Sequence, residues 1–140
     1  MRETASRRGC LPDAAQPARL IVFEWTGSWA LALRRHLASS ARLWPARSLA
    51  QAWDALALAP ASFLVLELSR NNAEALVARL LRLERDWPLA RAAVVADRSL
   101  AAYEWLVRQA GAVHFACTPR LAPSLADLAR RHLAAAPQPE

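Results

Sequence analysis

The sequence contains no lysine, because all 18 of its Lys and Arg residues are arginine. Any site that depends on a lysine ammonium group is therefore excluded. Glycine is also scarce, and three glycines in 140 residues cannot supply the glycine-rich phosphate loop of a Rossmann dinucleotide site. The two cysteines, Cys10 and Cys117, are too few for a disulfide framework, and their neighbourhoods show no metal-ligand spacing. We therefore expect a protein of the reducing cytoplasm.

The amino-terminal segment has no long apolar run. Residues 1–18 contain arginine and proline but no h-region, so we expect neither a signal peptide nor a membrane span there. The 140 residues, 55% of them hydrophobic, suffice for one domain with a sizeable core. We expect this domain to span residues 19–135, between a flexible N-terminal tail (1–18) and a C-terminal tail (136–140).

The formal net charge of +6 comes entirely from arginine. A positive charge of this size is one feature of proteins that bind nucleic acid. The arginines are spread along the chain rather than gathered in one run, however, and dispersed charge is more typical of solvated helix faces. An arginine-rich regulator that associates with nucleic acid is therefore the alternative hypothesis, not the main one.

The densest apolar run, residues 63–68, is typical of a strand that is buried on both faces of a parallel sheet. Apolar residues then recur at helical spacing from Ala73 to Trp87. The same strand-then-helix unit repeats about every 25 residues, which predicts a parallel sheet with helices on both faces and right-handed crossovers. The other expected strands are residues 20–23, 42–46, 92–96 and 113–116.

Pro45 predicts the order of these strands. Proline cannot donate to a β-ladder, so the strand at 42–46 belongs at a sheet edge, as in the order 2-1-3-4-5. The expected fold class is therefore α/β, a flavodoxin-like three-layer sandwich with a five-stranded parallel sheet. We also expect Ser28 and Ser48 to cap the first two helices and Gly111 to end the fourth.

The expected fourth helix, between Ser99 and Gly111, has an unusual outer face. Its buried side is predicted to carry Leu100, Tyr103, Leu106, Val107 and Ala110. Trp105 falls nearly opposite them, beside Arg108. An exposed tryptophan next to arginine is typical of protein–protein interfaces, although Trp105 packing on a tail or lying free on the surface is nearly as good an explanation.

Three segments stand out by their order and spacing: Ile21–Trp25 is an expected strand that ends in an acid, Phe63–Glu67 is another, and Gly111–Phe115 runs on to Thr118-Pro119. With these segments, about residues 19–135 resemble the receiver domain of two-component response regulators, and the resemblance makes Phe63–Glu67 the phosphoacceptor strand. The resemblance implies a family that takes phosphate on an aspartate and holds Mg²⁺ with an acidic pair. It also implies a Thr or Ser at the end of the fourth strand and a Lys before the proline after the fifth.

The chain departs from that pattern at each of these positions. The acceptor position carries Glu67, the acidic pair has become Glu24 and Trp25, the hydroxyl position is Ala96, and the lysine position is Thr118. One carboxylate beside an indole is a poor Mg²⁺ site, and the extra methylene of glutamate displaces its oxygens by about an ångström, enough to lose alignment. We expect a degenerate receiver that is not phosphorylated and has no catalytic residue, no metal site and no cofactor.

Such a domain is expected to act by binding a protein partner or a second copy of itself, without a membrane. The resemblance implies that the surface of helix four, strand five and helix five is used, which points to Tyr103, Trp105 and Arg108. A weaker hypothesis is an enzyme or small-molecule binder in which Glu24, Glu67 and Asp97 hold a cation. The three histidines lie in different elements at no ligand spacing, so packing explains them better than a metal site.

Two residues have alternative interpretations. Glu67 imitates a phosphorylated aspartate, or it is a vestigial acid that faces solvent or pairs with an arginine such as Arg70 or Arg98. Trp25 fills the emptied acidic pocket, or it is a stacking platform for a ligand.

Overall fold

The computed structural model describes residues 15–37 and 42–137, so Cys10 and most of the two predicted tails lie outside the described residues. The strands are β2 (Leu20–Phe23), β3 (Leu43–Ala46), β4 (Phe63–Glu67), β5 (Arg91–Val95) and β6 (His114–Ala116). The α-helices are α1 (Ser28–Arg34), α2 (Leu49–Leu58), α3 (Ala73–Asp86), α4 (Glu104–Ala110) and α5 (Ala122–Ala135). Two 3₁₀ helices, η2 (Arg98–Tyr103) and η3 (Pro119–Leu121), precede α4 and α5.

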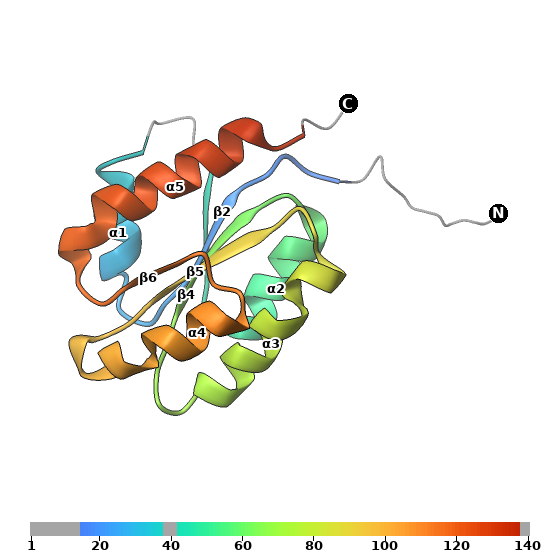
Figure 1. The fold of residues 1–140 in the computed structure, drawn as a ribbon. Helices are drawn as coiled ribbons and strands as arrows, with labels where there is room; N and C mark the ends of the chain where they lie inside the picture. Colours follow the sequence, from blue (N-terminus) through green and yellow to red (C-terminus); the bar gives the residue numbers. More distant parts are fainter. Residues whose placement is uncertain (1–14, 38–41, 138–140) are drawn as a thin grey trace.

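The strands form one five-stranded parallel sheet in the order β3-β2-β4-β5-β6. Helices α1 and α5 cover one face of the sheet, and α2, α3 and α4 cover the other (Figure 1). In chain order the strands therefore run 2-1-3-4-5, and the predicted three-layer flavodoxin-like sandwich is confirmed.

The alternation of side chains along β2 explains why each central strand is apolar throughout. Ile21 and Phe23 pack into the core under α2, α3 and α4, whereas Leu20 and Val22 pack into the core under α1 and α5. All four are at most 3% exposed. A strand with helices on both faces has no polar side, which is the physical origin of runs such as residues 63–66.

The edge strands of the sheet are β3 and β6, and β3 is the one that contains proline. The N–H of Leu20 donates to the carbonyl of Arg42, with 2.7 Å between N and O, and in a parallel ladder alternate residues face the neighbouring strand. Trp44 and Ala46 therefore turn their backbone groups toward β2, and Pro45 turns its backbone to the open side. No hydrogen bond between β2 and β3 is therefore lost because Pro45 has no N–H, and the exposed edge has one donor fewer.

The helix ends follow the predictions in part. Ser48 caps α2, because its hydroxyl accepts from the N–H of Gln51 at 3.0 Å, and Gly111, with φ of 123°, ends α4. Ser28 is the first residue of α1 instead of its cap. The cap residue is Gly27, whose φ of 81° is in the left-handed region that glycine adopts without strain.

The fourth helix is where the predicted periodicity fails. Its first part, up to Tyr103, belongs to the 3₁₀ helix η2 (Arg98–Tyr103), and only Glu104–Ala110 is α-helical. A 3₁₀ helix has about 3.0 residues per turn instead of 3.6, so the phase of the apolar face changes along the segment. Leu100 and Val107 are buried as predicted, but the predicted burial of Leu106 is wrong, since 41% of it is exposed.

Candidate functional site

The carboxyl ends of β2 and β4 bring Glu24 and Glu67 together. The two strands pair in parallel with Phe23 opposite Leu66, and each glutamate is the next residue along its strand. The negative charge of Glu24 is close enough to act on the pKa of Glu67. The sheet therefore places the two acids at adjacent strand ends, as the resemblance implies.

The carboxylate of Glu24 is occupied by the start of helix α1. Its Oε1 accepts from the N–H of Trp29 at 2.9 Å, and its Oε2 accepts from the N–H of Ala30 at 2.7 Å. The first N–H groups of a helix have no partner within the helix, and the positive end of the helix dipole favours an anion there. Glu24 thus does the capping that Ser28 was expected to do.

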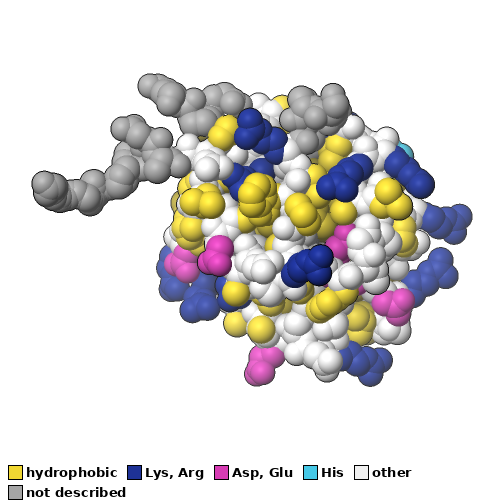
Figure 2. Space-filling view, turned by 180° about the vertical axis from the view of Figure 1, so that it is seen from behind, with side chains coloured by type: hydrophobic (Ala, Val, Ile, Leu, Met, Phe, Trp, Pro, Cys, Tyr) yellow, Lys and Arg dark blue, Asp and Glu magenta, His cyan; other side chains and the backbone are white. Residues whose placement is uncertain are grey.

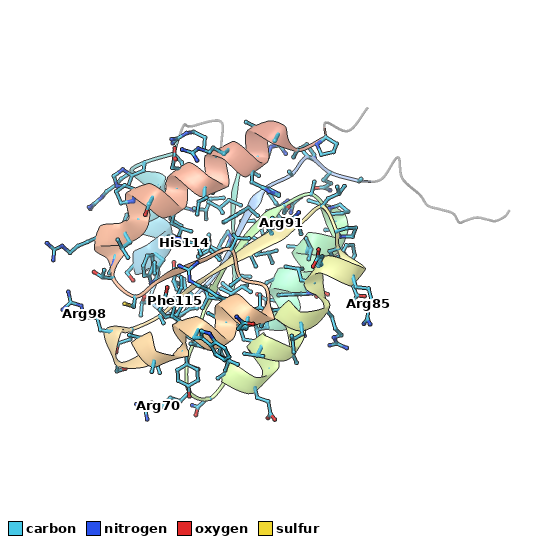
Figure 3. All side chains as sticks on the ribbon, in the orientation of Figure 1. Arg70, Arg85, Arg91, Arg98, His114 and Phe115 are labelled. Carbon is cyan, nitrogen blue, oxygen red and sulfur yellow. The ribbon has the colours of Figure 1, made fainter. Side chains whose placement is uncertain are left out.

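Glu67 is partly buried, and its Oε1 accepts from the backbone N–H of Trp25 at 2.8 Å. Burial raises the pKa of Glu67, the hydrogen bond from Trp25 lowers it, and the charge of Glu24 raises it, with a net upward shift. Within residues 15–37 and 42–137, Glu67 forms no ion pair. Arg70, in the loop after β4, and Arg98, the first residue of η2, extend outward (Figure 3), so the alternative in which Glu67 pairs with one of them is wrong.

The loop after Glu67 is fixed by reciprocal side-chain bonds. The N–H of Ser69 donates to Oδ1 of Asn72 at 2.8 Å, and the N–H of Asn72 donates to Oγ of Ser69 at 3.1 Å. The side-chain amide of Asn72 also donates to the carbonyl of Glu67 at 2.9 Å. These bonds hold the backbone of Glu67 as the chain turns into α3, and they explain Ser69 without a nucleophilic role.

Trp25 does not fill the acidic pocket, and that prediction is wrong. Its side chain is 55% exposed and contacts Phe23 edge-on, with 5.1 Å between the ring centroids. The carboxylates of Glu67 and Glu24 are instead bonded to backbone N–H groups, those of Trp25 and Trp29. Trp25 is also one of the residues that line an open pocket between β2, α1 and the end of β3.

The two remaining positions have structural tasks. Ala96 is buried, its N–H donates to the carbonyl of Ala116 at 3.0 Å, and its methyl group offers no hydroxyl. The hydroxyl of Thr118 accepts from the N–H of Arg120 at 3.4 Å and caps η3 ahead of Pro119. Neither side chain supplies a charge to the end of the sheet.

The acid trio of the weaker hypothesis does not assemble. The carboxylate of Asp97 accepts from the N–H and hydroxyl of Ser99 at 3.0 and 2.6 Å, and these bonds lower the pKa of Asp97. In the described part of the chain, no three Asp, Glu, His or Cys side chains lie close enough to share an ion. The predicted cation site of Glu24, Glu67 and Asp97 is therefore wrong.

The outer side of α4 carries an aromatic and an aliphatic side chain, Trp105 and Leu106, beside polar ones. Trp105 is 72% exposed, as predicted, while Tyr103 is partly buried. Arg108 forms an ion pair with Glu104, with 2.8 Å between Nε and Oε2. The indole of Trp105 is the most exposed large hydrophobic side chain of the helix. None of the helices in the described ranges has the length and apolar character that crossing a membrane would require.

No protein-family model and no curated protein sequence matches the chain. Solved structures do match. A CheY-like protein, tadZ, of Pseudomonas aeruginosa superposes with a TM-score of 0.66 at 22% identity, over 82% of this chain and 98% of that one. A response regulator of Thermotoga maritima gives 0.64 at 18% identity, over 86% and 99% of the two chains. The chain has the receiver fold.

A third match to the receiver fold is a pilus assembly-related protein of Burkholderia pseudomallei. It superposes with a TM-score of 0.58 at 19% identity, over 96% of this chain and all of the other. At identities this low the likeness concerns the fold alone. What the domain does has to be argued from its own side chains.

Sequence reasoning missed the role of Glu24. An acidic residue a few positions before a helix is a known sign of a favourable interaction with the helix N-terminus, and the segment Glu24–Ser28 carries that sign. The sequence also gave no reason to group Trp25 with Arg34 and Arg47, because these residues come from three different elements.

Proposed function

We propose that this chain is a receiver-fold domain that is not phosphorylated and acts by binding another protein, either a second copy or a signalling partner. One observation carries the first half of this proposal. The acids at the two strand ends, Glu24 and Glu67, already accept hydrogen bonds from backbone N–H groups of Trp25, Trp29 and Ala30. Mg²⁺ needs near-octahedral oxygen ligands, and a carboxylate engaged in this way is a poor one.

The charge balance supports the same conclusion. Phosphoryl transfer needs fixed cations and a metal to offset the charge on the transferred oxygens. The sequence has no lysine, Ala96 has no hydroxyl, and the nearby Arg70 and Arg98 extend away from the molecule (Figure 3). A phosphoryl group on Glu67 would lie next to the negative charge of Glu24 without a compensating cation.

The second half of the proposal concerns the outer side of α4. Trp105 has an apolar neighbour in Leu106, which is 41% exposed, and its charged neighbour Arg108 is already paired with Glu104. Large aromatic side chains bury much area at low entropic cost, which is why they are enriched at the centres of interfaces. We infer that a partner covers Trp105 and Leu106.

A nucleic-acid partner has less support. Figure 2 shows arginine side chains scattered over one face of the molecule, separated by apolar and acidic side chains. A protein that tracks a phosphate backbone needs a continuous basic stripe. Salt-sensitive binding to DNA of random sequence, with affinity that falls steeply as salt is raised, would favour this alternative over the main proposal.

The phosphorylation half is tested with acetyl phosphate and Mg²⁺, read by intact mass. We expect no added phosphoryl group on the wild type, and none on Glu67→Asp, because restoring the acceptor supplies neither the metal site nor the cation. An active receiver domain in the same reaction is the control. A phosphoryl adduct on the wild type would contradict the proposal; an adduct on Glu67→Asp alone would show that the acceptor length is the only defect.

A further inference from the structure

Two arginines lie opposite each other at the amino-terminal end of the sheet. The register pairs Leu20 of β2 with Leu43 of β3, so the residues before them, Arg19 and Arg42, are also neighbours. The carbonyl of Arg42 accepts from the N–H of Leu20 at 2.7 Å, which continues the ladder to this point. Side chains at paired positions of adjacent strands leave the sheet on the same face. Ile21, two residues after Arg19, packs under α2, α3 and α4, so both arginines belong to that face.

The guanidinium group of Arg19 is buried without a counter-charge in the described part of the chain. The residue is 3% exposed, and its Cζ lies 4.2 Å from the centre of the Trp44 ring. Its Nη2 donates to Oε1 of Gln16, whereas its Nη1 is buried and has no acceptor among the described residues. No described carboxylate forms an ion pair with Arg19 or Arg42. Buried charges are normally paired, because an unpaired one is costly to remove from water.

Arg42 brings a second positive charge to the same place. Burial lowers the pKa of Arg19, and the charge of Arg42 lowers it further. Like charges that lie directly opposite each other on neighbouring strands destabilise a sheet. Arg42 is exposed, so the pair can be reached from solvent on its side. Two adjacent cations, one of which has an unused donor, form an arrangement that an anion would stabilise.

We propose that Arg19 and Arg42 bind a small, doubly charged oxyanion, inorganic phosphate, at the amino-terminal end of β2 and β3. Phosphate carries about two negative charges at pH 8, which matches two guanidinium groups, and the planar fork of arginine donors suits its oxygens. Because Nη1 is buried, the anion has to be small, and the half-exposed Trp44 ring over the guanidinium has to shift. The proposal does not rest on the proposed function, because it uses neither Glu67 nor the surface of α4.

The indole N–H signal of Trp44 in ¹⁵N-labelled protein reports on this site, because the ring lies against the Arg19 guanidinium. The signal is assigned by its absence from the spectrum of Trp44→Leu. Sodium phosphate is titrated to about 20 mM at pH 8, with sodium chloride adjusted to hold the ionic strength constant. We expect a saturable shift with a Kd on the order of 1 mM. No saturable shift, or an equal shift with sodium chloride alone, would overturn the proposal.

Charge variants locate the anion. Arg42→Gln removes the exposed cation, and we expect it to weaken phosphate binding about five- to tenfold. Arg19→Met removes the buried charge and its unused donor, and we expect the saturable shift to disappear; if this variant does not fold, Arg42→Gln decides the question. Arg85→Gln is the matched control, because Arg85 is exposed at the far end of α3 (Figure 3) and should leave binding unchanged. Equal losses in Arg42→Gln and Arg85→Gln would show only general attraction to a basic protein and would overturn the assigned site.

Acetate and O-phosphoserine, titrated in the same way, identify the ligand. Acetate carries a single charge and should bind at least about fivefold more weakly than phosphate. Phosphoserine carries the phosphate group on a larger body, and the buried position of Nη1 predicts weaker binding for it too. Acetate that binds as tightly as phosphate would overturn the assignment to a doubly charged anion. Phosphoserine that binds more tightly would overturn the assignment to free phosphate and would point to a phosphorylated residue of a partner.

Discussion

The carboxylate of Glu67 accepts a hydrogen bond from the backbone N–H of Trp25, with 2.8 Å between the two atoms. This bond joins the end of β4 to the loop after β2, and it occupies an oxygen at the position where a receiver carries its phosphoacceptor. It only partly offsets the cost of burying the charge, since burial and the charge of Glu24 together raise the pKa of Glu67. The residue is thus a structural acceptor held at some electrostatic cost.

The first prediction concerns Glu67 and pH. A carboxyl group whose pKa is raised by folding stabilises the folded state below its unfolded pKa and loses that contribution as pH rises through the folded pKa. Glu67→Gln keeps an oxygen to accept from Trp25 and removes the charge. We expect the variant to have the higher free energy of unfolding at pH 7, and the difference to vanish by about pH 4.

Urea unfolding at a series of pH values measures this difference. Glu84→Gln, an exposed acid on α3, serves as the control and should follow the wild type at every pH. A wild type that is more stable than Glu67→Gln at pH 7 would show that the ionised carboxylate is needed, as it would be if an unrecognised cation compensated it.

The second prediction concerns Glu24 as the cap of α1. Glu24→Ala leaves the N–H groups of Trp29 and Ala30 without their acceptor, and we expect a loss of about 1–2 kcal/mol in the free energy of unfolding. Glu24→Gln keeps one acceptor oxygen and should lose less. Denaturant titration gives the values, and addition of Mg²⁺ should change the wild-type stability no more than that of the variants. A selective gain by the wild type would reveal a metal site at Glu24.

The fold could be predicted from the sequence because a strand buried on both faces of a sheet is apolar at every position, which is easy to recognise. Runs such as Phe63–Leu66 and Leu20–Phe23 are read directly as central strands, and Pro45 placed the edge strand correctly. The failure at Leu106 has a local cause. A change from 3₁₀ to α geometry within one segment shifts the apolar phase, and no single period describes both parts.

The candidate site was less predictable for a different reason. Sequence position showed which side chains stand at the strand ends, but a hydrogen bond between residues 42 positions apart, as between Trp25 and Glu67, depends on backbone atoms that carry no sequence signal. The same holds for Arg34 and Arg47, which only the crossover from α1 to β3 brings to one pocket. The positions of the acids at the strand ends could be predicted, but their hydrogen-bond partners could not.

The third prediction concerns Trp105. Because its side chain is 72% exposed, Trp105→Ala should change the free energy of unfolding by no more than about 0.5 kcal/mol. If α4 is the interaction surface, the same change should abolish self-association in sedimentation velocity, or capture of the partner where the wild type is monomeric. Trp44→Ala, on the opposite sheet edge and 48% exposed, is the matched control. If both changes reduced association equally, or if neither changed it, the α4 surface would be ruled out as the interface.

The last prediction concerns the open edge at β3. Pro45 turns its backbone to the open side, and the next N–H on that side, that of Arg47, donates to Oε1 of Gln51 at 2.8 Å. The edge therefore offers few donors to another strand. Pro45→Val restores one N–H and a β-branched side chain, so we expect concentration-dependent self-association by light scattering, with the fold retained. Pro88→Val, at an exposed proline outside the sheet, should stay as the wild type. If Pro45→Val also stayed monomeric, the missing N–H donor would not be what prevents pairing with another strand. The exposed Trp44 and the twist of the edge would then be the cause.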